Sequence, residues 1–156
     1  MVLQPQYNRL YLEPHLTEDL NNTIVRYNMR GTLYEINLRT DLFKISAHNF
    51  SISSSVAFGI DTDSTRLEYY EGKTRTPRLV FEKKGEGEVN IDVLKKDTQG
   101  LPVWTVLSSA NQAVEQTVHG LNPGVEYHLY VDSEIMEDMR ANTMGSLSFI
   151  VTVKWV

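Results

Sequence analysis

Apolar residues at every second position are the dominant pattern of this chain. The clearest run spans 147–155, with apolar side chains at Leu147, Phe149, Val151, Val153 and Trp155. Residues 125–131 repeat the pattern. A period of two is that of a β-strand with one buried face. Both segments are therefore predicted to be strands, with Trp155 on the core face of the last one.

Shorter apolar runs of the same kind recur between turn-forming residues through the second half of the chain. They lie at 66–70, 77–83, 89–93, 103–107 and 114–118. Short strands separated by Gly, Pro and Asp at this spacing are typical of a β-sandwich or jelly roll. We therefore predict an all-β fold, an antiparallel β-sandwich over 66–156. Residues 133–145 could add one helical turn.

The segment 23–65 is predicted to be a further β region of the same domain. Strands are expected near 24–27 and 32–38, and a third run places Phe50, Ile52, Ser54, Val56, Phe58 and Ile60 on one face. An apolar patch at 42–45 could belong to a short helix over 40–48. The polar segment 61–65 is expected to form the seam with the C-terminal sandwich.

Residues 1–22 are predicted to form an extended N-terminal arm. Prolines favour an extended path, and the apolar residues of this segment follow neither a helix nor a strand period. Two interpretations stay open: a tail packed on its own domain, or an arm docked on a neighbouring subunit. For the second, the candidate interface residues are Leu3, Tyr7, Leu10 and Tyr11, since tyrosine and large apolar groups dominate interface energetics.

The dipeptide Pro123-Gly124 fits the centre of a type II turn, because proline presets the first φ and glycine accepts the positive second φ. Leu121-x-Pro123-x-x-x-Tyr127 resembles the E–F corner of fibronectin type III domains, in which the tyrosine hydroxyl bonds to backbone upstream. The resemblance implies strands E, F and G at 114–118, 125–131 and 146–156, and binding or spacing roles. Trp104 lies later than the family's core tryptophan, so a jelly roll or another immunoglobulin-like topology stays open.

Composition and charge exclude several classes of function. The 156 residues include no cysteine, which removes disulfides and thiolate sites. A formal net charge of −5 without a basic run argues against a nucleic-acid partner. No apolar stretch is long enough to span a membrane, and the N-terminal residues lack the regions of a signal peptide. We expect neither a membrane partner nor a signal peptide in this chain.

No catalytic or metal-binding motif is found. The four histidines fall in different predicted elements, although His119 and His128 flank the turn and could approach each other. Asp61 and Asp63 resemble the start of a calcium loop, but Arg66 and Gly72 stand where that loop needs glycine and glutamate. A solvated turn is the expected structure there. We predict no enzyme activity, no cofactor and no metal.

These observations favour a structural subunit of a large assembly, such as a virion capsid, decoration or tail component or another extracellular particle. The partners would be other protein subunits, in a homo-oligomer or a hetero-assembly. The alternative is a carbohydrate-binding module that stacks glycan on Tyr70, Trp104 and Tyr130. Because neighbouring residues of a strand face opposite sides, at most one of Tyr69 and Tyr70 is expected in the core.

Overall fold

The computed structural model describes residues 2–6, 9–13, 24–29, 32–37, 42–45, 49–54, 58–63, 65–71, 74–94, 100–131 and 134–153. Side chains are described from Asn49 onward within these ranges, apart from those of 134–136. Every regular element in them is a strand, which confirms the all-β prediction. None of these residues forms a helix long and apolar enough to cross a membrane.

The larger sheet has seven strands, and all of its neighbouring strands pair antiparallel. Their spatial order is β1 (Val2–Gln6), β2 (Arg9–Glu13), β7 (Phe58–Thr62), β8 (Arg66–Glu71), β9 (Leu79–Lys83), β12 (Gln112–Val118) and β15 (Leu147–Val153). The sheet therefore combines strands from both ends of the chain.

The second sheet has six strands, in the order β11 (Trp104–Ser108), β10 (Val89–Val93), β6 (Phe50–Ser54), β5 (Leu42–Ile45), β4 (Thr32–Asn37) and β3 (Ile24–Met29). Its pairs are antiparallel except β6 with β10, which run parallel with Ile52 opposite Ile91. Parallel strands need a long crossover connection. Here the crossover contains β7, β8 and β9 of the seven-stranded sheet.

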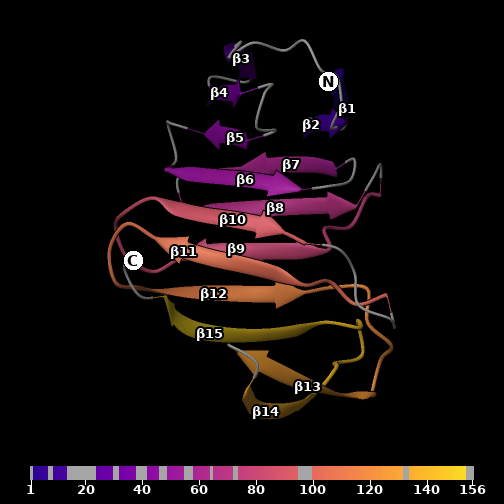
Figure 1. Ribbon diagram of the computed structural model, residues 1–156. Helices are drawn as coiled ribbons and strands as arrows, with labels where there is room; N and C mark the ends of the chain where they lie inside the picture. The colour runs from indigo at the N-terminus through magenta and orange to yellow at the C-terminus, as the bar shows by residue number, and fades with distance from the viewer. Residues whose placement is uncertain are drawn as a thin grey trace.

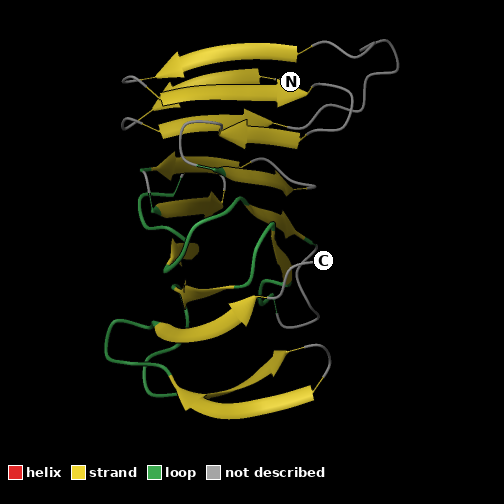
Figure 2. Cartoon of the chain, turned by 90° about the vertical axis from the view of Figure 1, so that its left-hand side faces the viewer, coloured by secondary structure: helices red, strands yellow, loops and turns green. Residues whose placement is uncertain are grey.

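Among the described strands, the remaining two, β13 (Glu126–Val131) and β14 (Glu134–Arg140), pair with each other and with no third strand. They form a twisted ribbon at the end of the molecule opposite β1 and β3 (Figure 1). Turned by 90°, the chain shows its strands stacked from the N-terminal end to this ribbon (Figure 2).

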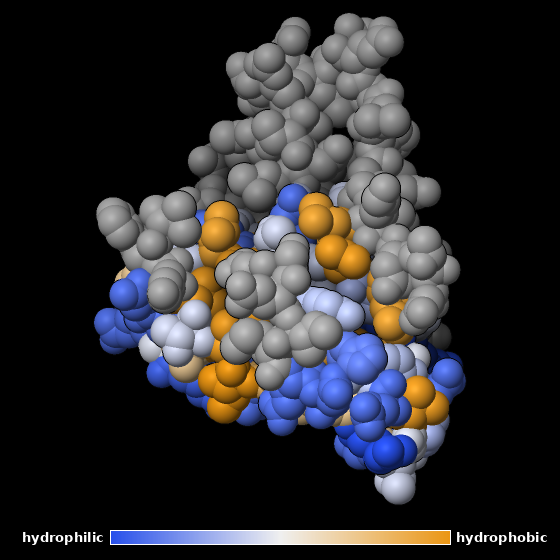
Figure 3. Space-filling view, turned by 60° about the horizontal axis from the view of Figure 1, so that its bottom comes forward, coloured by the Kyte–Doolittle hydropathy of each residue, from blue (hydrophilic) through white to orange (hydrophobic). Residues whose placement is uncertain are grey.

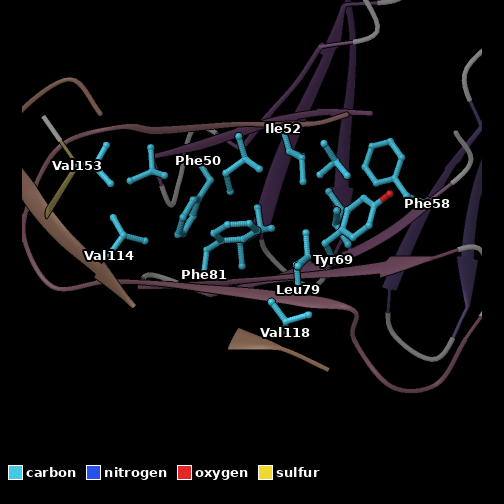
Figure 4. Packing of buried hydrophobic residues seen from close by; sticks show 14 of the residues in the cluster. Phe50, Ile52, Phe58, Tyr69, Leu79, Phe81, Val114, Val118 and Val153 are labelled. Atoms are coloured by element: carbon cyan, nitrogen blue, oxygen red, sulfur yellow. The ribbon is translucent and has the colours of Figure 1, made fainter. Parts of the chain in front are cut away.

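The core lies between the two large sheets, where apolar side chains of both inner faces interdigitate (Figure 4). Phe50 and Ile52 of β6 have no exposed surface, and Phe81 of β9 is equally enclosed. The rings of Phe58 and Tyr69 stack with centroids 5.5 Å apart. Aromatic rings bury large apolar areas, and here they pack among the Ile, Leu and Val side chains of both sheets.

The alternation along the C-terminal strands matches their burial. On β12 the buried positions are Gln112, Val114, Gln116 and Val118, with half-buried residues between them. On β15 the inner positions Leu147, Phe149 and Val151 are half-buried because this strand is the edge of the seven-stranded sheet. Trp155 lies outside the described residues.

The predicted single strand over 50–60 is wrong, because the chain divides it between two sheets. Phe50 and Ile52 belong to β6 in the six-stranded sheet, whereas Phe58 and Ile60 belong to β7 in the other. All four nevertheless lie in the core. The period of two correctly predicted which side chains point inward. The same period continues from β6 into β7, so it did not reveal that the chain passes from one sheet to the other.

Both helical expectations are also wrong. Residues 42–45 form β5, in which Phe43 lies opposite Ile52 in the register. Residues 134–140 form β14, in which Arg140 lies opposite Glu126. In each case pairing with a neighbouring strand overrides a weak local helical preference.

The polar segment 61–65 joins β7 to β8 within one sheet. The Asp63 carboxylate accepts hydrogen bonds from the backbone N–H groups of Thr65 and Arg66, each at 3.0 Å. This turn matches the solvated turn expected there. Residues before and after this turn in the sequence, from Phe50 to Val153, belong to one core cluster.

The turn at Pro123-Gly124 has the predicted geometry. Gly124 has φ 75°, and the N–H of Val125 donates to the carbonyl of Asn122 at 3.2 Å. The Tyr127 hydroxyl accepts a hydrogen bond from the backbone N–H of Asn122 at 3.0 Å, as in a tyrosine corner.

The strand order beyond this corner is not that of a fibronectin domain. In immunoglobulin-type sandwiches strands E and G belong to opposite sheets. Here their counterparts, β12 and β15, pair side by side along seven residues each, and β13 leaves the sheet for the ribbon. The likeness is therefore confined to the corner.

Tyr69 and Tyr70 are both buried, with 1% and 4% of their surface exposed, but Tyr69 alone belongs to the core cluster between the sheets, which confirms the expectation of at most one. They do face opposite sides of β8. Tyr70 lies opposite Gly59 in the register, and its hydroxyl donates to the Glu68 carboxylate at 2.6 Å. A glycine neighbour leaves room for a ring against the outer face of the sheet.

The first part of the predicted arm is a hairpin of the protein's own sheet. β1 pairs with β2, and β2 pairs with β7, where Leu10 lies opposite Ile60. For residues 2–6 and 9–13 this agrees with the first of the two interpretations, a tail packed on its own domain. Pro5 is compatible with β1 because that strand is the edge of the sheet, where a missing N–H costs no ladder bond on the open side. Residues 14–23 lie outside the described ones.

Gly145→Ala should destabilise the fold more than Gly124→Ala. Both glycines have nearly the same positive φ, 74° and 75°. A Cβ at Gly145 would lie 2.3 Å from the Leu121 carbonyl oxygen, whereas nothing lies within 4 Å of one at Gly124. We expect a loss of about 1–2 kcal/mol at Gly124 from backbone strain alone and a larger loss at Gly145. Urea unfolding measures the free energy of unfolding of both variants. Equal losses would show that the Leu121 carbonyl does not crowd a side chain at position 145.

Candidate functional site

The four residues predicted to form an interface are placed only by their backbone. Leu3 lies in β1, and Leu10 and Tyr11 lie in β2, whereas Tyr7 falls outside the described residues. β1 ends the sheet order, and none of the described strands pairs with its outer side. The predicted interface segment therefore includes the N-terminal edge of the seven-stranded sheet.

The three aromatic residues proposed for glycan stacking do not share a face. Tyr70 is buried on the outer face of the seven-stranded sheet. Trp104 lies on the inner side of β11, where its ring contacts those of Phe81 and Phe149. Tyr130, 58% exposed, belongs to the ribbon. An exposed stacking platform formed by all three is thus not assembled.

The two described histidines also have separate partners. His119 Nδ1 lies 2.6 Å from the Ser146 hydroxyl, whereas His128 Nδ1 contacts the Asp138 carboxylate across the ribbon. In the described part of the chain, no three or more His, Cys, Asp or Glu residues are grouped so that they could hold a metal ion. His15 and His48 lie outside it.

A shallow hollow of about 630 Å³ opens on the outer face where β12 and β15 meet the turn between β14 and β15. Its lining is rich in hydroxyl groups, which come from Thr76, Thr117, Ser146 and Ser148. The other lining residues are His119, Gly120, Asn142 and Met144. The register explains this gathering, because Thr117 lies opposite Ser148, and their hydroxyls are 2.9 Å apart.

The turn at 142–146 forms one wall of the hollow. The Asn142 side-chain oxygen accepts hydrogen bonds from the N–H groups of Met144 and Ser146, at 2.9 and 3.0 Å. The carbonyl of Gly145 accepts the N–H of Leu121 at 2.9 Å. These bonds hold Ser146 next to His119 and leave Met144 projecting, with 82% of its surface exposed.

Arg78 holds the opposite wall in place. Its Nη1 donates to the carbonyls of His119 and Gly120, at 2.8 and 2.9 Å. Its Nε lies 3.5 Å from a Glu71 carboxylate oxygen. A Cβ at Gly120 would lie 2.5 Å from Nη1, and Gly120 has φ 76°, a backbone conformation that favours glycine.

The electrostatics of the hollow favour a neutral imidazole. Burial lowers the pKa of His119 below its usual value, and the charge of Arg66 lowers it further, against an opposing effect of Glu68. The Ser146–His119 pair has the hydroxyl and the base of a nucleophilic site, which also needs a third group to orient the base. No carboxylate of the described residues is hydrogen-bonded to the imidazole, so the arrangement does not complete a catalytic triad.

Sequence reasoning missed the hollow. Thr117 and Ser148 occur in ordinary alternating strands, Ser146 lies in the turn before β15, and no spacing within the sequence distinguishes them. The signal in the sequence was a hydroxyl side chain at an outward position of each strand, Thr117 and Ser148. These two residues become informative only once β12 and β15 are known to pair.

The ribbon end of the molecule presents a different surface. Apolar side chains lie there in patches among polar ones (Figure 3). Val125 and Tyr130 are exposed near the ribbon, and Ile150 is exposed on the outer face of β15. Across the ribbon, Arg140 Nη2 lies 3.6 Å from the Glu126 carboxylate. Such exposed pairs contribute little to stability.

Comparison of the chain with protein-family models found no match, and searches among curated proteins and solved structures likewise found none. The functional argument therefore depends on the chain's own residues.

Trp104→Phe should lower the free energy of unfolding by about 1–3 kcal/mol, because it leaves a buried acceptor without its donor. Trp104 Nε1 donates to the buried Gln116 side-chain oxygen at 2.7 Å. The double variant Trp104→Phe with Gln116→Leu should recover much of the loss, since it removes both polar partners. Urea unfolding of the three proteins is the measurement, and a harmless single variant would show that the bond is unimportant.

The two histidines should titrate on opposite sides of the usual pKa of about 6.5. Burial lowers the pKa of His119, whereas the hydrogen bond and charge of Asp138 raise that of His128. The stabilisation from charged His128 is present below its unfolded pKa and lost as the pH rises through its folded pKa. In an NMR titration, the Asp138→Asn variant should show a lower pKa for His128 and an unchanged pKa for His119. An unchanged pKa of His128 would show that Asp138 is not what raises it.

Proposed function

We propose that the protein is a non-catalytic structural subunit of a larger assembly and docks on neighbouring subunits through its N-terminal segment. The observation that supports this most is the position of β1, which is the outermost strand of the seven-stranded sheet. Its outer side has no partner among the described strands.

An edge strand presents unpaired N–H and C=O groups that can pair with another chain. Strand addition of this kind uses backbone bonds for affinity and side chains for specificity. Pro5 supplies no N–H to such a contact, so pairing along β1 is expected to be short. Leu3, Leu10 and Tyr11 would complete the contact from the same hairpin.

The proposed neighbours are other protein subunits, either further copies of this chain or different chains. The proposed setting is a virion or another extracellular particle, because repeated subunits present edges to each other in a fixed geometry. Nucleic acid and membrane are not proposed as partners, since the chain has a formal net charge of −5 and no basic run.

The test is removal of residues 1–8, which deletes β1 and retains β2. Deleting all of 1–22 would also remove β2, the sheet partner of β7. A loss of association could then result from loss of the fold instead of loss of the docking strand. The shortened protein should keep its far-ultraviolet circular dichroism spectrum and a cooperative unfolding transition. Sedimentation velocity and co-purification from the native source should show loss of the oligomer or of the partner that the full chain retains.

Leu107→Lys is the matched control, because Leu107 is exposed on β11, an edge strand of the other sheet. This variant should associate as the full chain does. The proposal is overturned if the full chain neither self-associates nor retains a partner, or if the protein without residues 1–8 associates normally.

A further inference from the structure

The hollow beside His119 contains polar groups that have no partner in the described part of the chain. The Asn142 side-chain oxygen is occupied by two backbone N–H groups, but its amide nitrogen is not hydrogen-bonded there. His119 uses Nδ1 toward Ser146, which leaves Nε2 available. The Thr76 hydroxyl also lines the hollow without a bond to another described group.

The hydroxyl pairs of the hollow retain hydrogen-bonding capacity as well. When one of Thr117 and Ser148 donates to the other, the accepting hydroxyl keeps its own proton for a ligand. The His119 imidazole adds one further group at Nε2, which donates or accepts according to which nitrogen carries the proton. The hollow therefore offers both donors and acceptors.

No described residue that lines the hollow carries a permanent charge. The lowered pKa of His119 keeps its imidazole uncharged at neutral pH. The Thr76 and Thr117 methyl groups and the projecting Met144 side chain add apolar surface between the polar atoms. Its volume of about 630 Å³ lies within the roughly 300–1,000 Å³ of small-molecule sites.

We propose that this hollow binds the ring of a neutral sugar. A pyranose carries hydroxyls that both donate and accept, together with C–H surface, and so matches neutral polar groups beside methyl and thioether surface. An anionic ligand would find no cation among the lining residues, and a cation would find no carboxylate. Because the hollow is shallow, binding is weak and exchange is fast.

This site is distinct from the aromatic platform considered for the sequence, since it contains none of Tyr70, Trp104 and Tyr130. It is also independent of the proposed assembly role. Strands β12 and β15 lie at the far side of the seven-stranded sheet from β1, so a defect in docking would not impair it.

The test is a titration of the ¹⁵N-labelled full chain with glucose, galactose, mannose and N-acetylglucosamine, followed by NMR. At least one should shift the amide signals of 117–120 and 142–148 in a saturable manner. The double variant Thr117→Val with Ser148→Ala, which removes two hydroxyls with little change of shape, should weaken that binding by about tenfold. Thr105→Val, at an exposed position on β11, is the matched control and should bind as the unmodified chain does.

Glucuronate provides the charge control and should bind more weakly than glucose. Three results with the unmodified chain overturn the proposal: no saturable shift with any of the four neutral sugars, shifts confined to other residues, or glucuronate binding as well as glucose. Full affinity of the double variant overturns it too, because the hydroxyl row would then have no part in recognition. Amide spectra of the sugar-free variants show whether each remains folded.

Discussion

The structure depends on the contact between the inner faces of β6 and β10 and those of β7, β8 and β9. β6 and β10 lie side by side and parallel, yet the chain between them forms three strands of the opposite sheet. The crossover can close only if both inner faces are apolar, because unpaired polar groups between the sheets would cost more than the contact gains. Phe50, Phe58 and Phe81 meet that condition, each with no exposed surface. The ribbon lies beside this core and contacts it through Tyr127 of β13.

The parts of the fold that the sequence predicted are those decided by local chemistry. The turn at Pro123-Gly124 needs only a fixed φ followed by a positive φ, and both residues supply these by themselves. The alternation of β12 and β15 likewise requires only that one face be buried. The passage from β6 to β7 was missed because the same inward phase suits either sheet. Phe43 was assigned to a possible helix because its opposite neighbour in the sheet, Ile52, is not visible from local pattern.

The hollow beside His119 could not be predicted for a related reason. Thr117 and Ser148 are 31 residues apart, and only the pairing of β12 with β15 brings their hydroxyls together. The resemblance to a fibronectin corner pointed away from that pairing, because it assigned the two strands to opposite sheets. The corner itself is present, as the bond from Asn122 to Tyr127 shows. A short turn motif therefore constrains its own loop and leaves the partners of the adjoining strands open.

The two proposed contacts lie at different places in the same sheet, which allows each to act without the other. From β1 to β12 there are five strand spacings, or about 24 Å at roughly 4.8 Å each. Sites separated by more than about 10 Å with no shared partner usually behave additively. A neighbour docked along β1 would thus leave the hollow between β12 and β15 open to solvent. A subunit organised in this way could be held in an assembly by one edge of its sheet while the outer face near the other edge still met a ligand.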